Sequence, residues 1–204
     1  MEKPKKLPLH AITRSAHSKI VQDLPPHVYE GIGKIVAAQA ILETAVTDLL
    51  FNLAEIDFSV GRVVFRYQAG SERFKTVKRL MVLHGLETTL PSVPSVVSEL
   101  EQQITDCCNA RDQFAHGVWI QCPDRELALR VSKGQFETDE GIIDRTFVPQ
   151  AMSVPDEYYE QTRQVILTTA AAIDRLRRKL VAALKARSAL AHIIAKATTQ
   201  RHHN

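Results

Sequence analysis

Residues 25–56 read PPHVYEGIGKIVAAQAILETAVTDLLFNLAEI, and this stretch is the strongest indication of the fold class. Apolar side chains return every three or four positions from Val28 to Ile56, with Gln39 as the polar interruption. This spacing places the side chains along one face of an α-helix. Such a helix is stabilised mainly by burying its apolar face against other elements. The stretch therefore predicts a mainly α-helical bundle.

Further along the chain, several other stretches continue the helical pattern. A short helix is expected from Asp57 to about Tyr67. Another carries Phe74, Val77, Leu80, Met81 and Leu83, and Gly85 and Pro91 end it. The next helix begins near Ser95, and its apolar stripe is Val97, Leu100, Ile104, Cys107, position 111 and Phe114. A long C-terminal helix follows Pro155, with a predicted core stripe of Tyr158, Val165, Thr169, Ala172, Leu176, Leu180 and Leu184.

Between these last two helices the pattern changes to alternation, which favours strands. Residues 118–122 and 127–131 read as two strands joined by a turn, and a third strand is expected at 142–148. We therefore predict a small β-hairpin or meander insert at about 118–148. Trp119 is interpreted as a core anchor rather than a platform for base stacking. The predicted divisions are a flexible basic segment at 1–23, one helical domain at 24–198 and a tail at 199–204.

Charge is unevenly distributed over the 204 residues. The net charge is +3, but residues 163–204 hold nine basic and one acidic side chain, and residues 1–23 hold five basic and two acidic. The middle of the chain is therefore acidic. A basic terminal helix can attract a polyanion such as RNA, or it can be a solvated face that keeps the protein soluble. Its apolar stripe is interpreted as core or coiled-coil seam rather than as an RNA groove.

Several classes of protein lack their usual sequence features. Charges interrupt every long apolar run, so no membrane span is expected, and the basic N-terminus has no apolar segment typical of a secretory signal. We therefore expect a cytoplasmic protein. Cys107, Cys108 and Cys122 fit neither a disulfide framework nor paired metal-ligand spacing. No phosphate loop or metalloprotease motif occurs, so no cofactor and no metal are expected.

One short segment, RDQFAHG at 111–117, combines residues that can carry chemistry. Arg111 falls on an apolar stripe, where a charge needs an anionic partner, a polar interface or a solvent-filled pocket. A histidine can exchange protons with ribose and leaving-group oxygens, while a guanidinium holds the phosphate. Asp112 lies four residues before His116 and shares its helix face, so it can orient the ring. Gly117 is expected to close the helix in the left-handed conformation.

Arg111 and His116 lie roughly 140° apart around a regular helix, so a single straight helix does not bring them together. Either the helix opens near Gly117 or a second protomer completes the site. Two other pairs, Arg79–His84 and Arg187–His192, share the spacing. The pair at 111 alone has a charged residue directly after the arginine and an arginine on an apolar stripe.

The string RDQFAHG resembles the signature of the HEPN superfamily, with Asp112 standing where asparagine is commonest. The helical layout of 25–117 is also similar. The resemblance implies a helical homodimer whose two motifs face one cleft, and a metal-independent endoribonuclease that cleaves RNA by 2′-hydroxyl attack. It implies phosphate binding by Arg111, proton transfer by His116 and orientation by Asp112. Toxin, antiphage defence or RNA-processing roles are implied, with a cognate antitoxin or a nucleotidyltransferase as partner.

Other interpretations remain open at this stage. Arg111 can instead form a buried ion pair with Glu43 or Asp48, with His116 stabilised by the helix dipole and Asp112 as its partner. The protein would then be a non-catalytic helical homodimer that binds a protein or nucleic acid. A third interpretation is a membrane-surface or scaffold role through the basic terminal helix, although exposed aromatic residues are few there. The residues do not specify an RNA sequence or a pathway.

Overall fold

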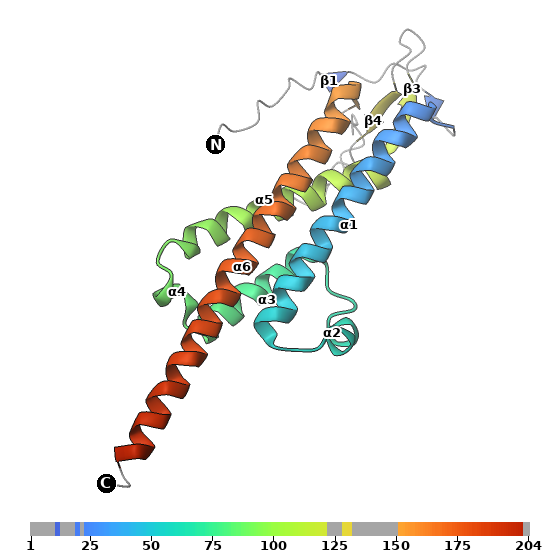
Figure 1. The fold of residues 1–204 in the computed structure, drawn as a ribbon. Helices are drawn as coiled ribbons and strands as arrows, with labels where there is room; N and C mark the ends of the chain where they lie inside the picture. Colours follow the sequence, from blue (N-terminus) through green and yellow to red (C-terminus); the bar gives the residue numbers. More distant parts are fainter. Residues whose placement is uncertain (1–10, 13–18, 21–22, 122–127, 132–150, 202–204) are drawn as a thin grey trace, which may run out of the picture. The chain divides into compact units, whose positions relative to one another are not determined.

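The computed structural model describes residues 11–12, 19–20, 23–121, 128–131 and 151–201, and most of these are helical (Figure 1). The six helices of the described part are α1 (Pro26–Ala54), α2 (Phe58–Val64), α3 (Gly70–Leu83), α4 (Leu86–Thr89), α5 (Val93–His116) and α6 (Asp156–Arg201). The mainly α-helical fold class is thereby confirmed. The short α4 was not expected, because four residues are too few to show a helical period.

Short strands accompany the helices: β1 (Ala11–Ile12), β2 (Lys19–Ile20), β3 (Val118–Gln121), β4 (Ala128–Val131) and β5 (Ala151–Ser153). They form one sheet in the order β1-β5-β4-β3-β2, and all neighbours are antiparallel. Residues 122–127, the expected turn, and residues 142–148, the expected third strand, lie outside the described residues. The hairpin insert therefore stays a prediction, and so does the flexibility of residues 1–23, most of which are also not described.

The chain divides into two compact units, and each is described by itself. Unit 1 contains residues 1–37 and 109–164, and unit 2 contains residues 38–108 and 165–204. The helices α1, α5 and α6 each contribute residues to both units. The segment at 111–117 belongs to unit 1.

Burial follows the predicted stripes of α1, α3 and α5 closely. In unit 2, buried side chains of these helices include Leu42, Val46, Leu49, Leu53, Phe74, Val77, Met81, Val97, Leu100, Ile104 and Cys107. Leu83, the last apolar residue named for this predicted helix, is 78% exposed, because it lies in the last turn of α3 just before the chain changes direction. That change occurs at Gly85, whose positive φ of 62° is easily adopted by glycine.

The predicted core stripe of α6 is wrong by one residue at three positions. Tyr159, Ile166 and Ile173 are buried, whereas their neighbours Tyr158 and Ala172 are half-buried and Val165 is exposed. Thr169, Leu176 and Leu180 are buried as predicted. At the three shifted positions an apolar residue directly follows the expected one, so two apolar neighbours compete for the core. Periodicity alone does not choose between them.

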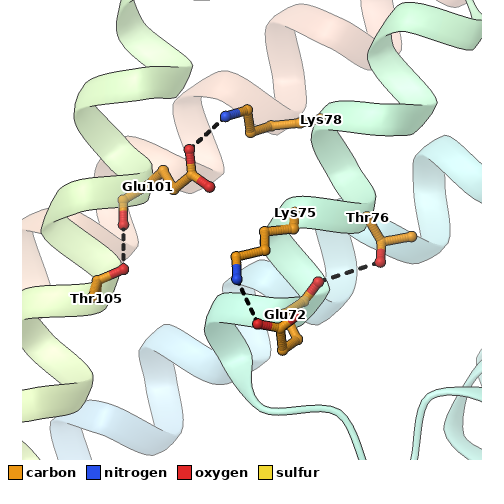
Figure 2. A network of polar contacts seen from close by, with 6 residues as sticks. All are labelled: Glu72, Lys75, Thr76, Lys78, Glu101 and Thr105. Carbon is orange, nitrogen blue, oxygen red and sulfur yellow. Dashed lines mark hydrogen bonds and ion pairs between the residues drawn. The ribbon is translucent and has the colours of Figure 1, made fainter.

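Polar contacts connect the outer surfaces of α3 and α5 within unit 2 (Figure 2). Lys78 of α3 forms an ion pair with Glu101 of α5, and within α3 the Lys75 ammonium donates to the Glu72 carboxylate at 2.6 Å. The Thr105 hydroxyl donates to the backbone oxygen of Glu101 at 2.9 Å. Exposed pairs of this kind stabilise a fold by at most about 1 kcal/mol each, so the apolar residues account for most of the stability.

By length and composition alone, α1 is long and apolar enough to cross a bilayer. We had expected no membrane span, because charges interrupt the apolar runs of the sequence. Its most apolar 18-residue window is 44% buried inside the protein. The core helix of a soluble protein meets the same criterion, so this finding is weak evidence for a membrane span.

Candidate functional site

The segment 111–117 lies where α5 ends and β3 begins. The end of α5 from residue 109 and the whole of β3 belong to unit 1. The helix ends at His116, as expected, and the Gly117 amide donates to the Gln113 carbonyl at 3.1 Å. Gly117 does not adopt the left-handed conformation that we expected. Among the described glycines only Gly85 has a positive φ. The reason is that the chain continues directly into the extended strand β3 instead of reversing.

Phe114 anchors this end of α5. Its side chain is buried, and its ring centroid lies 5.9 Å from that of Tyr158 and 5.3 Å from that of Tyr159, both in the first turn of α6. Burial raises the pKa of Tyr159 to about 12. This aromatic cluster fixes the rotation of the last turns of α5, and therefore fixes which of the motif side chains face outward.

With Phe114 directed inward, Asp112 and His116 are exposed on the other side of the helix. Arg111 is half-buried, with 30% of its side chain accessible. The structure thus places the guanidinium at the edge of the apolar face. There the aliphatic part of the side chain can be covered while the charged end keeps contact with water and with an anionic partner.

Asp112, the next residue in the chain, is one anionic partner of Arg111. Arg111 Nη1 lies 2.7 Å from Asp112 Oδ1, so the first two residues of the motif form an ion pair. The structure brings Asp112 to Arg111, and among the described residues it shows no hydrogen bond from His116 to Asp112. Asp112 and His116 nevertheless share a face, one turn apart, where side-chain rotation can exchange the partners of the carboxylate. The alternative pairing of Arg111 with Glu43 or Asp48 stays a prediction.

A second imidazole in unit 1 was not found by sequence reasoning. His27 Nε2, in the first turn of α1, lies 3.7 Å from Asp156 Oδ1, in the first turn of α6. Both side chains are mostly exposed. The two residues are far apart in the sequence and carry no motif, so no local signal could have identified the pair.

The neighbouring thiols in unit 2 offer little chemistry. Cys107 is buried, and burial raises the pKa of its thiol to about 11, which keeps it protonated near neutral pH. The Gln39 amide donates to Cys108 Sγ at 3.4 Å. Within the described residues, no three His, Cys, Asp or Glu side chains gather as metal ligands would.

Trp119 in β3 is buried, as its interpretation as a core residue predicted. The chemical groups available at this end of α5 are therefore a guanidinium, a carboxylate and an imidazole, all reachable from solvent. Comparison with known proteins finds no matching family model, no matching curated protein and no matching solved structure.

Proposed function

We propose that this protein is a HEPN-like, metal-independent endoribonuclease, and that two copies of residues 111–116 form its active site. The observation that supports the proposal is the half-buried Arg111 beside the exposed Asp112 and His116, held at the end of α5 by the buried Phe114. A rigidly anchored helix end with outward-facing acid–base and cationic groups suits catalysis, because the groups need no large rearrangement to meet a substrate.

In the proposed reaction one His116 accepts the proton of a ribose 2′-hydroxyl, and the 2′-oxygen attacks the adjacent phosphorus. The bond from phosphorus to the 5′-oxygen breaks, and His116 of the second copy gives that oxygen a proton. The products are a 2′,3′-cyclic phosphate and a 5′-hydroxyl. Arg111 stabilises the charge on the phosphoryl oxygens. RNA then competes with Asp112 for the guanidinium, which leaves the carboxylate able to orient the His116 ring.

The experiment compares two histidines with the same sequence spacing from an arginine. His116→Ala is expected to lower the rate of RNA cleavage in EDTA by about 100- to 10,000-fold, because a positioned acid–base group contributes that much. His192→Ala alters the exposed second histidine of the Arg187–His192 pair and is expected to cleave at the wild-type rate. Circular dichroism melts check that both variants are folded. Equal rates for wild type and folded His116→Ala would refute the assignment.

The ion pair between Arg111 and Asp112 favours a second candidate, a non-catalytic dimer in which these residues hold the structure. In that case Asp112→Ala would lower the melting temperature and the wild type would not cleave RNA. If the enzyme proposal is correct, Asp112→Ala reduces cleavage while the melting temperature changes little, because Asp112 is exposed and exposed pairs contribute little stability.

A further inference from the structure

Unit 2 carries an apolar surface that its own core does not use. The surface lies on α2 and the residues after it, which Figure 1 shows as a short helix beside the end of α1, joined by loops to α1 and α3. Five large apolar side chains are exposed there: Phe58 (55%), Val60 (52%), Val63 (77%), Val64 (63%) and Tyr67 (89%). We call these five residues the α2 surface. Clusters of exposed apolar side chains of this kind usually mark a binding surface.

The inner side of α2 is held firmly against α1. Gly61 lies so close to the buried Phe51 ring that a Cβ atom added to it would be 2.5 Å from the ring. Phe51 also contacts the rings of Phe58 and Phe65 at centroid distances of 5.7 Å and 6.1 Å. The helix is therefore fixed with Gly61 inward and Phe58 partly packed on Phe51, while Val60, Val63, Val64 and Tyr67 stay exposed.

Arg73 of α3 strengthens this attachment. Its Nη1 donates to the Thr47 hydroxyl of α1 at 3.0 Å, and its Nη2 donates to the backbone oxygen of Phe65 at 3.4 Å, just after α2. The same arginine lines a cavity of about 830 Å³ together with Arg62, Arg66, Glu43 and Asp48. The cavity carries charges of both signs, and the inference uses only its two solvent-exposed arginines, Arg62 and Arg66, with the exposed apolar residues beside them.

Arg62 and Arg66 are the charged residues of the stretch 58–71. The acidic residues on either side already have partners, because Asp57 accepts a hydrogen bond from the Ser59 amide and Glu72 pairs with Lys75. Each arginine lies over an aromatic ring, Arg62 over Phe58 at 5.7 Å and Arg66 over Tyr67 at 5.4 Å, and in the described part of the chain neither forms an ion pair. By contrast Arg163, Arg177 and Arg178 of α6 all pair with acidic side chains. The α2 surface is thus apolar with an aromatic residue at each end, and beside it lie two arginines without ion-pair partners among the described residues.

We propose that the α2 surface docks onto the surface of an anionic phospholipid bilayer. Aliphatic and aromatic side chains enter the boundary between headgroups and acyl chains, while arginines bind the phosphates. Tyrosine suits that boundary because its ring is apolar and its hydroxyl stays hydrated. Symmetric pairing with the same face of a second copy suits the observations less, because it gathers the arginines of both copies at one contact. The inference is independent of the proposed nuclease, and it places the membrane contact on α2, whereas the sequence had suggested such a contact only for the basic terminal helix.

The test measures sedimentation of the full chain with vesicles of phosphatidylcholine alone or with about 30% phosphatidylglycerol. Binding is expected only to the anionic vesicles, and it should weaken as salt is raised. The double variant Val63→Ser/Val64→Ser should bind at least about tenfold more weakly, because two apolar side chains no longer enter the bilayer. The matched control is Val82→Ser/Leu83→Ser on α3, whose side chains are equally exposed, and it should bind like wild type.

A charge variant completes the design. Arg66→Gln should weaken vesicle binding about fivefold, whereas Arg79→Gln, an exposed arginine of α3, should not. Both double variants retain the basic end of α6. If that end were responsible for vesicle binding, the two double variants would bind equally well. The inference is overturned if wild type ignores anionic vesicles, if both double variants bind equally, or if the α2 variants change only the oligomeric state measured by sedimentation velocity.

Discussion

Among single residues, Arg111 shows which side-chain contacts can be predicted from the sequence and which cannot. Its place on an apolar stripe called for an anionic partner, a polar interface or a solvent-filled pocket, and the structure shows a half-buried guanidinium paired with Asp112. The partner was not predictable in detail, because neighbouring residues on a helix do not share a face and their contact depends on rotamers. The same limit applies to His27 and Asp156, whose proximity depends on the pairing of two distant helix ends.

Cys107 leads to a prediction about pH. Burial raises the pKa of its thiol from 9.0 to about 11, so the folded protein keeps this proton at pH values where the unfolded chain loses it. The free energy of unfolding should therefore fall between about pH 9 and pH 11, by up to about 1.4 kcal/mol per pH unit. In Cys107→Ala this contribution is absent, so the decrease with pH should be shallower.

Urea unfolding at pH 8, 9 and 10 gives the comparison. The change with pH is the readout, since the smaller alanine lowers stability at every pH. Tyr159, whose pKa is also raised by burial, contributes equally to both proteins. Identical pH dependence in wild type and Cys107→Ala would show that the thiol is not the group responsible.

At the scale of elements, periodicity predicted α1, α3 and α5 well because each has one dominant apolar stripe. In α6 it found Thr169, Leu176 and Leu180 correctly but was one residue off at Tyr158, Val165 and Ala172, because each of these has an apolar neighbour that is buried instead. Gly117 does not take a positive φ, because a strand follows it directly, and the four residues of α4 were too few to detect. The exposure of α2 was also not predictable, because the close approach of Gly61 to Phe51 decides which side of that helix faces inward.

Two glycines of α1 test how closely this helix packs. A Cβ atom added at Gly31 would lie 2.6 Å from the Tyr159 ring, whereas one added at Gly33 would have nothing within 4 Å. Gly31→Ala should lower the free energy of unfolding by about 1–3 kcal/mol, because the ring must move. Gly33→Ala should raise it by up to about 1 kcal/mol, because alanine favours the helix. Urea melts of the two variants measure both effects, and a stabilising Gly31→Ala would contradict the packing described.

For the whole molecule, the sequence predicted the helical class and the acidic body with basic ends, which follow from composition and periodicity. It did not predict the division into two compact units. That division depends on which distant segments pack together, and no short window of sequence contains this information. The assembly expected for the nuclease, with a second copy completing the site, also belongs to this scale and stays a proposal.

The end of α6 gives a prediction about partners. Residues 185–193 are exposed, and Arg187 donates to the backbone oxygen of His84. Removing residues 185–204 deletes Lys185, Arg187, Lys196 and Arg201. The shortened chain should bind single-stranded RNA more weakly and with a flatter dependence on salt, because fewer counterions are released. Fluorescence anisotropy at several salt concentrations measures this. Unchanged affinity and slope would indicate a solvated face instead.

The most direct test of the nuclease proposal is the chemistry of the RNA ends. Wild-type protein in EDTA should produce 2′,3′-cyclic phosphate and 5′-hydroxyl ends, and an RNA with 2′-O-methyl groups throughout should remain intact. Mass spectrometry of the fragments identifies both ends. Uncut RNA, products with 5′-phosphates, or cleavage of the methylated RNA would contradict attack by the 2′-hydroxyl, and with it the role proposed for Arg111 and His116.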